Sequence, residues 1–218
     1  MNTVPTLIIG NKNYSSWSLR PWLVMAHTGI AFEELRIPLY APGSREHILQ
    51  FSPAGKVPVL IDGDVVVWDS LAICEYLAEQ HLQLWPQDVV ARAHARSICA
   101  EMHSGFTELR RAMPMNCKAS MPGLGRIPAV EYDIFRITAI WQDCRSRYAA
   151  GGEFLFGRFS IADAMYAPVV LRLRSYGVGL PPESQQWADM IVALPAMQQW
   201  IAAGRAETEV LPQFELSP

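Results

Sequence analysis

The chain has 218 residues, half of them apolar, so one large domain or two small ones can bury a sizeable core. Charged residues make up 18% and the formal net charge is −3, which excludes the broad positive field of nucleic-acid-binding proteins. No apolar run approaches the roughly 20 residues that cross a bilayer, and the N-terminus lacks the pattern of a secretory signal. We therefore expect a soluble cytoplasmic protein with neither nucleic acid nor membrane as a partner.

The cysteines point to a reducing compartment and away from a metal site. The four of them are widely spaced and form no Cys-x-x-Cys pair. Cys99 and His103 can share a helix face, but His94 would lie on the opposite side of the same helix. The sequence therefore predicts no bound metal.

The first third of the chain reads as alternating strands and helices. A strand at 5–9, a helix at 17–28 closed by Gly29 and a strand at 32–38 make a βαβ unit. A short helix is predicted at 44–50. Asp62-Gly63 then lies between two apolar runs, which is a strong hairpin signal, and a helix is predicted at 70–81. The order βαβ followed by ββα is typical of a small thioredoxin-like domain.

Strand signals all but disappear after residues 82–88, which we interpret as a linker. Helices are predicted further along, with Pro and Gly between them, at 89–112, 129–149, 161–174 and 187–203. The sequence thus predicts an α/β domain at 1–81 and an all-helical bundle at 89–218. The longest connector runs from Pro114 to Pro128, and loops of that length are often functional or mobile.

The segment Asn13–Trp22 joins the first predicted strand to the first predicted helix and contains Ser15, Ser16 and Ser18. The first turn of a helix presents unpaired N–H groups and the positive end of the helix dipole, so a nearby hydroxyl can help to stabilise an anion. Serine is also a preferred N-cap and Pro21 suits a first turn. Taken alone, the segment is better explained by helix initiation.

Two further segments could hold a small zwitterion. Pro58 cannot donate to a strand ladder, so Val57 can keep free backbone groups for an extended peptide, and a cis bond between them would suit such a turn. Asp69 offers a carboxylate to an ammonium, and Ser70 with the helix N-terminus offers donors to a carboxylate. Taken alone, Pro58 is better explained as a residue that marks the start of a strand, and Asp69-Ser70 as an ordinary helix cap.

Together these segments resemble the cytosolic glutathione transferase family, and the resemblance covers nearly the whole chain. It is carried by Ser15-Ser16-Trp17-Ser18, Lys56-Val57-Pro58-Val59-Leu60 and Asp69-Ser70-Leu71-Ala72-Ile73, in the order and approximate spacing of that family. In the second domain, Ser160-Ile161-Ala162-Asp163 looks like the buried capping box of the family. Such a box stabilises a helix by about 1 kcal/mol or more, so Ser160 and Asp163 are assigned a structural role.

The resemblance implies glutathione as the co-substrate. It places Ser15 near the thiol, with Ser16 as a close second choice, and Val57 against the cysteinyl part, just before a cis Pro58. Asp69 and Ser70 would hold the γ-glutamyl end. Lys56 is left with two interpretations of equal weight, a contact to the glycyl carboxylate or a solvated side chain.

The chemistry then follows from charge. A free thiol has a pKa of about 8.5 and is a poor nucleophile until it ionises. A hydrogen bond donated by Ser15, together with the helix N-terminus, stabilises the thiolate and lowers that pKa. Glutathione would then attack a small electrophile held against the helical domain, and the serine would form no covalent bond.

The Ser-Ser-x-Ser-x-Arg pattern is most similar to the zeta class of the family, which includes maleylacetoacetate isomerases. Trp17 stands where that class usually has cysteine, and Pro21-Trp22 replaces its Val-Arg, which removes a cation that could meet a dicarboxylate. We therefore expect a glutathione transferase acting on an apolar electrophile, with a glutathione-dependent isomerase as the alternative. A non-catalytic glutathione-binding or scaffold protein is a further alternative. A glutaredoxin-like reductase ranks below these, because serines replace its cysteine and Cys74 falls at core spacing.

On the second domain, His103 and Arg110 are candidate contacts for the electrophile, since the first long helix faces the thiol site in this family. Arg110 and Arg111 point about 100° apart, so at most one of them lines the cleft. The simpler interpretation is a hydrogen-bonded interdomain histidine and a solvated arginine. The resemblance also implies a homodimer.

Overall fold

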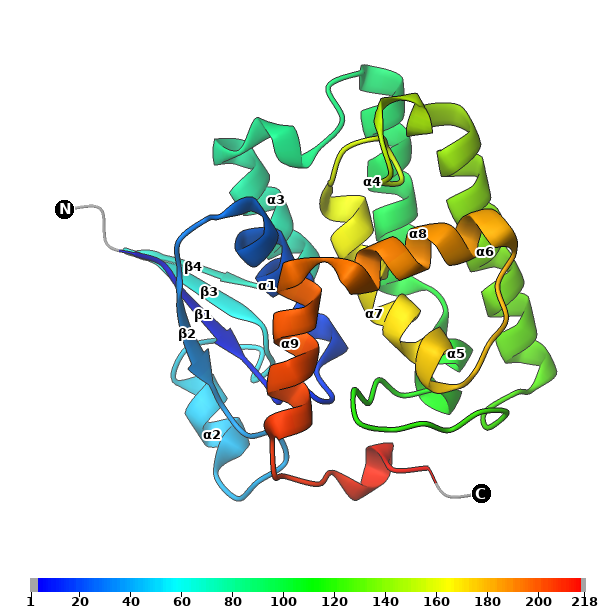
Figure 1. Cartoon of the computed structure of the whole chain (residues 1–218). Coiled ribbons are helices and arrows are strands. Elements are labelled where there is room, and N and C mark those ends of the chain that lie inside the picture. Colours follow the sequence, from blue (N-terminus) through cyan, green and yellow to red (C-terminus); the bar gives the residue numbers. More distant parts are fainter. Residues whose placement is uncertain (1–3, 217–218) are drawn as a thin grey trace.

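The first part of the chain folds into a four-stranded sheet with helices on both faces (Figure 1). This computed structural model describes residues 4–216, and the elements of the first part are β1 (Thr6–Ile9), α1 (Ser16–Thr28), β2 (Glu33–Arg36), α2 (Ser44–Leu49), β3 (Val59–Asp62), β4 (Val65–Trp68) and α3 (Ser70–Gln80). The thioredoxin-like order expected from the sequence is confirmed. Residues 1–3 and 217–218, which the predicted domain limits include, lie outside the described residues.

The sheet has the strand order β2-β1-β3-β4, with β1 parallel to β2 and the other two pairs antiparallel. Successive side chains of a strand point to opposite faces. Leu7 and Ile9 of β1 accordingly join the main core with α1 and α3, whereas Ile8 packs with Ile37 and with Ile48 of α2.

The topology brings three chain segments to one edge of the sheet. The C-terminal half of β1 pairs with the start of β3, and the end of β4 pairs with that same start, since Val59 lies opposite both Ile8 and Trp68. The loop after β1, the residues before β3 and the residues after β4 therefore meet at this edge. These are the three segments that carry the candidate site residues.

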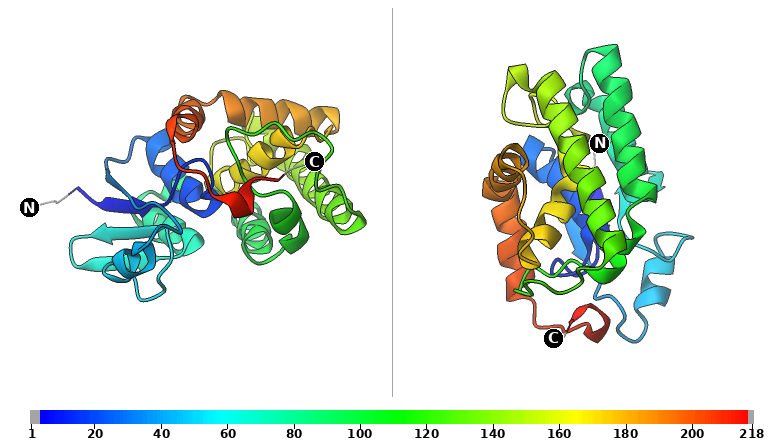
Figure 2. Two further views of the ribbon diagram at one scale, coloured as in Figure 1. Left: turned by 90° about the horizontal axis from the view of Figure 1, so that it is seen from below. Right: turned by 90° about the vertical axis from the view of Figure 1, so that its right-hand side faces the viewer.

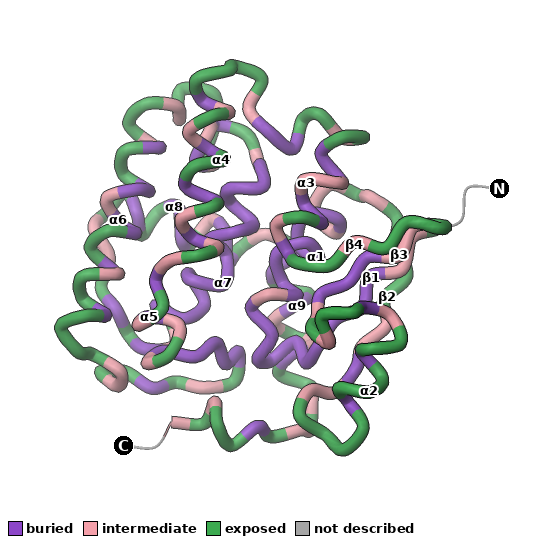
Figure 3. Tube along the Cα trace, turned by 180° about the vertical axis from the view of Figure 1, so that it is seen from behind, coloured by how far each residue is buried: buried purple, intermediate pink, exposed green. Residues whose placement is uncertain are grey.

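The second part is helical and is built around one buried helix. Its elements are α4 (Val89–Ser104), α5 (Thr107–Ala112), α6 (Pro128–Tyr148), α7 (Ile161–Ser175), α8 (Pro182–Ala193) and α9 (Pro195–Ala206). In Figure 3, α7 is purple for most of its length, and it packs against α1, α4 and α8. Because α7 touches both parts of the chain, it fixes the helical part against the α/β part.

The start of α7 is held by a buried carboxylate. Asp163 Oδ2 accepts hydrogen bonds from Ser160 N (2.9 Å) and Ser160 Oγ (3.1 Å), and Oδ1 accepts from Leu155 N (3.0 Å) and Trp187 Nε1 (3.1 Å). Burial raises the pKa of Asp163 to about 6, against the lowering effect of these donors.

Two predicted helices are each divided in two. The helix predicted at 89–112 is interrupted at Gly105-Phe106, where Phe106 takes the left-handed conformation with φ 53°. The helix predicted at 187–203 is also two helices, with Pro195 as the first residue of α9. A residue before proline is pushed out of the helical region, and Leu194 has ψ 133°. Apolar spacing continues across both breaks, so periodicity alone missed them.

After α9 the chain turns back toward the α/β part. We call residues 207–216 the C-terminal strap; it includes a short 3-10 helix at Pro212–Phe214. In the left-hand view of Figure 2 the strap, in red, crosses the junction of the two parts. No helix within residues 4–216 has the length and apolar character needed to span a bilayer.

Candidate active site

A cavity of about 630 Å³ lies between the two parts of the chain. The α/β part contributes Tyr14, Ser15, Ser16, Trp17, Lys56 and Val57, among others, and the rest of the chain contributes Arg110, Pro114, Met115, Arg172 and Phe214. A second hollow of about 450 Å³ shares Trp17, Lys56 and Val57 with the cavity and adds Pro58, Asp69, Ser70 and His103. The structure thus brings the candidate residues for thiol and peptide binding into two adjoining spaces.

Ser15 is the N-cap of α1. Its Oγ accepts a hydrogen bond from Ser18 N (3.3 Å) and donates to Ser18 Oγ (2.7 Å), which also accepts from Gly10 N (3.1 Å). Ser15 is mostly buried yet borders the cavity, so its hydroxyl stands at the positive end of the helix dipole. The cap interpretation and the anion-stabilising one are therefore compatible.

Ser16 also borders the cavity, and it has a cationic partner. Arg172 of α7 donates from Nη2 to Ser16 Oγ (3.0 Å) and from Nη1 to the carbonyl oxygen of Met113 (2.5 Å). Because the arginine fills an acceptor position of the Ser16 oxygen, the hydroxyl proton remains available to a ligand. Ser16 is thus placed to donate to an anion, and Ser15 can do so once its hydroxyl turns from Ser18 Oγ toward the cavity.

Positive charge gathers around these serines. Arg20 and Arg110 lie on the Trp17 ring, with guanidinium carbons 4.1 Å and 5.4 Å from its centroid. Burial, followed by the charges of Arg172 and Arg110, lowers the pKa of Arg20 to about 9, and burial lowers the pKa of Arg172 to about 10. At neutral pH both guanidinium groups remain charged.

None of Arg20, Arg110 and Arg172 forms an ion pair with a carboxylate of residues 4–216. Arg20 Nη1 is buried without a hydrogen-bond partner. A buried charge without a counterion is costly, and an anion in the adjoining cavity would reduce that cost. The electrostatics of the cavity therefore favour a negatively charged occupant.

The second hollow is suited to a zwitterion. Asp69 adopts φ 80°, and its Oδ1 caps α3 by accepting from Leu71 N (2.9 Å) and Ala72 N (3.3 Å). Its Oδ2 lies 3.2 Å from Nε2 of His103, which comes from α4 and also packs edge-on against Trp17. The Ser70 hydroxyl is buried and has no hydrogen-bond partner, so it is free for a ligand.

Val57 and Lys56 line both spaces, and the Val57–Pro58 peptide bond is cis. Lys56 is exposed, at the rim where the cavity and the hollow meet. Of the two candidate residues from the helical part, Arg110 lines the cavity, whereas His103 lines the hollow beside Asp69. Arg111 instead forms an exposed ion pair with Glu108 (2.6 Å).

Sequence reasoning missed Arg172, which lines the cavity, whereas Trp22 does not line it. Trp22 is buried in the core against Trp200, with ring centroids 5.1 Å apart, and donates its indole N–H to Glu34 (2.7 Å). The arginine that the zeta class carries at the position of Trp22 is absent from this chain. Arg110 of α5 and Arg172 of α7 supply positive charge to the cavity instead. The sequence contains one signal that could have identified Arg172: it is an arginine within the apolar run of α7. Arginine is almost never fully buried unless it has a polar partner.

No cysteine of the chain can act as the nucleophile. Cys74, Cys99, Cys117 and Cys144 are all buried, and burial raises the pKa of each thiol, to about 12 for Cys117 and Cys144. Within residues 4–216, no group of three or more His, Cys, Asp or Glu side chains converges as a metal site would require.

The comparisons with known proteins agree with this geometry. Residues 14–80 match the family model described as glutathione S-transferase, N-terminal domain, and residues 92–203 match that of the C-terminal domain. The chain belongs to the glutathione S-transferase family. The family match spans both the sheet that carries the serines and the helices that carry Arg110 and Arg172.

Relatives within the family include isomerases and transferases. The chain is 30% identical to the maleylacetoacetate isomerase of Rattus norvegicus over 187 residues, which cover 82% of each chain. It is 27% identical to a probable maleylacetoacetate isomerase of Caenorhabditis elegans, covering 83% of this chain and 84% of that one. Glutathione S-transferase GstB of Escherichia coli is 30% identical over 166 residues, covering 69% and 76%.

Solved structures share the family fold. A Burkholderia glutathione transferase homolog with bound glutathione superimposes with a TM-score of 0.72 at 23% identity, covering 94% of this chain and all of that one. The partial resemblance to the zeta class, noted from the serine motif, is in line with the isomerase relatives.

Proposed function

We propose that this protein is a glutathione transferase that binds glutathione across the two adjoining spaces and stabilises its thiolate for attack on a small electrophile. The observation that carries the proposal is the N-terminus of α1, where two serine hydroxyls border a cavity that Arg110 and Arg172 also line. Arg20 lies against the Trp17 ring of the same cavity wall, and none of the three arginines has a carboxylate partner within residues 4–216. Thiolate formation is the step that such an environment favours.

The residues of this chain divide the work of binding. Asp69 meets the γ-glutamyl ammonium, and the unpartnered Ser70 hydroxyl, with the N-terminus of α3, meets the adjacent carboxylate. Val57 pairs through its backbone with the cysteinyl residue, and Lys56 at the rim reaches the glycyl carboxylate. This assignment leaves the thiol at the shared border of the two spaces, on the side of Ser15 and Ser16.

Activation is electrostatic. The Ser15 hydroxyl turns from Ser18 Oγ and donates a hydrogen bond to the sulfur, and Ser16, held by Arg172, supplies a second donor. The thiol proton passes to solvent. The thiolate sulfur then bonds to a carbon of the electrophile, either as a leaving group departs with its bonding electron pair or as a double bond opens and its other carbon takes up a proton from solvent. Each unit by which the thiol pKa falls corresponds to about 1.4 kcal/mol of preferential binding of the anion.

The test is a calorimetric titration of the purified protein with glutathione, followed by an ultraviolet scan of the thiolate band as the pH is varied. Binding with a thiol pKa well below that of free glutathione supports the proposal. Binding without such a shift favours the non-catalytic glutathione-binding alternative. Absence of binding overturns both.

A second candidate, glutathione-dependent isomerisation of an anionic substrate, is favoured by Arg110 and Arg172. Their guanidinium groups border the same cavity and supply the cations that the Trp22 position lacks. Two of the relatives are named as maleylacetoacetate isomerases. Turnover of maleylacetoacetate at a rate above that of chlorodinitrobenzene conjugation would favour this candidate over the transferase.

We also propose that two copies associate through exposed apolar side chains. Trp68 on β4, and Tyr132 and Phe135 on α6, are 45%, 73% and 72% exposed. Exposed aromatic side chains of this size are typical of association surfaces. Light scattering on the eluted protein decides the point: a mass of two chains supports it, and a mass of one chain overturns it.

A further inference from the structure

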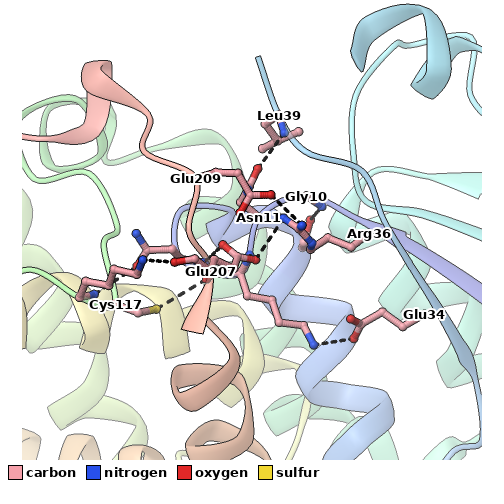
Figure 4. A network of polar contacts seen from close by, with 12 residues as sticks. Gly10, Asn11, Glu34, Arg36, Leu39, Cys117, Glu207 and Glu209 are labelled. Atoms are coloured by element: carbon pink, nitrogen blue, oxygen red, sulfur yellow. Dashed lines mark hydrogen bonds and ion pairs between the residues drawn. The ribbon is translucent and has the colours of Figure 1, made fainter. Parts of the chain in front are cut away.

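The C-terminal strap returns to the loop that carries the serines. We call residues 10–15, between β1 and α1, the serine loop. Both carboxylate oxygens of Glu207 accept hydrogen bonds from the backbone of the serine loop: Oε1 from Lys12 N (2.6 Å) and Oε2 from Asn13 N (3.1 Å). Figure 4 shows this carboxylate beneath the loop, with neighbouring polar contacts around it. The Glu207 side chain is only 7% exposed, so water competes little for these donors.

These two N–H groups lie inside the turn that delivers Ser15. The carbonyl oxygen of Asn11 accepts from Tyr14 N (3.1 Å) and from Ser15 N (2.8 Å), which closes the turn around Lys12 and Asn13. The two residues that Glu207 holds are therefore the middle of the turn. A shift of their peptide groups would move the N-cap serine and the first turn of α1 with it.

The same turn is packed from the side of α9. A Cβ on Gly204 would lie 3.1 Å from Asn13 N and 3.1 Å from the Lys12 carbonyl carbon, so glycine is needed for this close approach. The far end of the strap holds the loop as well, because Tyr14 donates its hydroxyl to Glu215 (2.5 Å). Phe214, between these contacts, borders the cavity.

The charge of Glu207 is matched by its surroundings. Arg36 of β2 lies 3.6 Å from its carboxylate, and Lys118 donates to its backbone carbonyl oxygen. Lys12 directs its ammonium away, to Glu34 (2.7 Å). The shortest contacts of the Glu207 carboxylate are therefore those to the backbone N–H groups of Lys12 and Asn13, for which it is a charged acceptor.

We propose that Glu207 is a positioning residue, whose carboxylate fixes the serine loop so that Ser15 and Ser16 keep the geometry needed to stabilise the glutathione thiolate. The inference rests on the proposed function. It assigns to the C-terminal strap a part in catalysis, although the strap lies about 190 residues beyond the serines in sequence and contributes no group to the reacting atoms.

The test compares Glu207→Gln with Glu209→Gln. Glutamine at 207 keeps the size of the side chain but offers one acceptor oxygen and turns its NH₂ group toward a backbone N–H. Glu209 lies on the same strap, pairs with Arg36 (2.7 Å) and forms no hydrogen bond to the serine loop, which makes it the matched control.

For Glu207→Gln we expect a raised thiol pKa of bound glutathione, a kcat lowered about tenfold or more, and a calorimetric Kd for glutathione within about threefold of the wild type. The amides of residues 12 and 13 should exchange hydrogen faster. Glu209→Gln should match the wild type in all four measurements. An unchanged thiol pKa, kcat and exchange rate in Glu207→Gln overturns the inference.

Failure of the proposed function is distinguishable from failure of this inference. If the wild type binds no glutathione, the proposed function fails, while amide exchange in the two variants still decides whether Glu207 holds the loop. If Glu207→Gln does not fold, Glu207→Asp keeps the charge but shortens the side chain, so that the carboxylate no longer reaches both backbone N–H groups. A raised thiol pKa with faster amide exchange at residues 12 and 13 in that variant supports the inference, and an unchanged thiol pKa and exchange rate overturn it.

Discussion

Replacement of Asp69 by asparagine isolates the charge that we assign to recognition of the γ-glutamyl ammonium. Asp69 does three other things: its Oδ1 caps α3, its Oδ2 lies 3.2 Å from Nε2 of His103, and its backbone takes φ 80°. Asparagine is as good an N-cap as aspartate and is among the residues that tolerate positive φ. Asp69→Asn therefore removes the negative charge and leaves the cap and the backbone conformation in place.

The expected loss can be worked from the exposure of this side chain. A hydrogen bond between charged groups contributes about 1.5–3 kcal/mol when shielded from water. The Asp69 side chain is 43% exposed, so screening reduces the contribution to about 1–2 kcal/mol. The Kd for glutathione should accordingly rise about 5- to 30-fold at 25 °C. Urea denaturation should show a change in stability below about 0.5 kcal/mol.

The assay is isothermal titration at pH 7 with glutathione and, as a matched ligand, with cysteinylglycine, which lacks the γ-glutamyl residue. Only the affinity for glutathione should fall. An Asp69→Asn protein that binds glutathione as tightly as the wild type, or that loses affinity for both ligands equally, would refute the assignment of Asp69 to the ammonium.

The other predictions concern activation and stability. Ser15→Ala should lower turnover about 10- to 100-fold and raise the thiol pKa of bound glutathione, as seen in the ultraviolet titration; if only Ser16→Ala has this effect, Ser16 is the thiol donor. Arg172→Met should raise that pKa by about one unit, because it removes a cation and the donor that holds Ser16, and an unchanged titration would contradict this. Asp163→Asn should lower stability by about 2–4 kcal/mol at pH 7, since its NH₂ group faces two of the four donors; exposed Asp189→Asn is the control, and a loss below about 1 kcal/mol would be inconsistent with the capping network. Because the pKa of Asp163 is raised, its carboxyl takes up a proton at a higher pH in the folded protein than in the unfolded chain. Protonation of this group therefore increases the free energy of unfolding as the pH falls from about 6 to 4. Asp163→Asn should abolish that part of the pH dependence.

The fold could be predicted from sequence because each of its elements has a local signal. Asp62-Gly63 marks the β3–β4 hairpin, and apolar spacing marks α1 and α3. The breaks at Gly105-Phe106 and at Pro195 escaped prediction because the apolar residues keep their helical spacing on both sides. Gly105 and Pro195 were nevertheless local signals of these breaks, because glycine is a poor helix former and a residue before proline is pushed out of the helical region.

Part of the candidate site was predicted from the family resemblance: Ser15, Val57 and Asp69 from their motifs, and His103 and Arg110 from their place on the helical part. The meeting of β1, β3 and β4 at one edge of the sheet explains why the first three lie together. The position of Arg172 at the cavity depends on how α7 packs against α1. That position follows from tertiary packing between residues more than 140 positions apart, which motif spacing does not encode.

If the chain acts on reactive electrophiles as proposed, the burial of all four cysteines has a consequence. Its own thiols are protonated and screened from the cavity, so a compound that alkylates sulfur meets no competing nucleophile of that kind on the protein. The protein should therefore survive prolonged incubation with an alkylating reagent such as iodoacetamide without labelling, and retain its activity toward glutathione added afterwards. The protein would then not be inactivated by its own substrates, because the only thiol that reacts in each turnover would be that of glutathione.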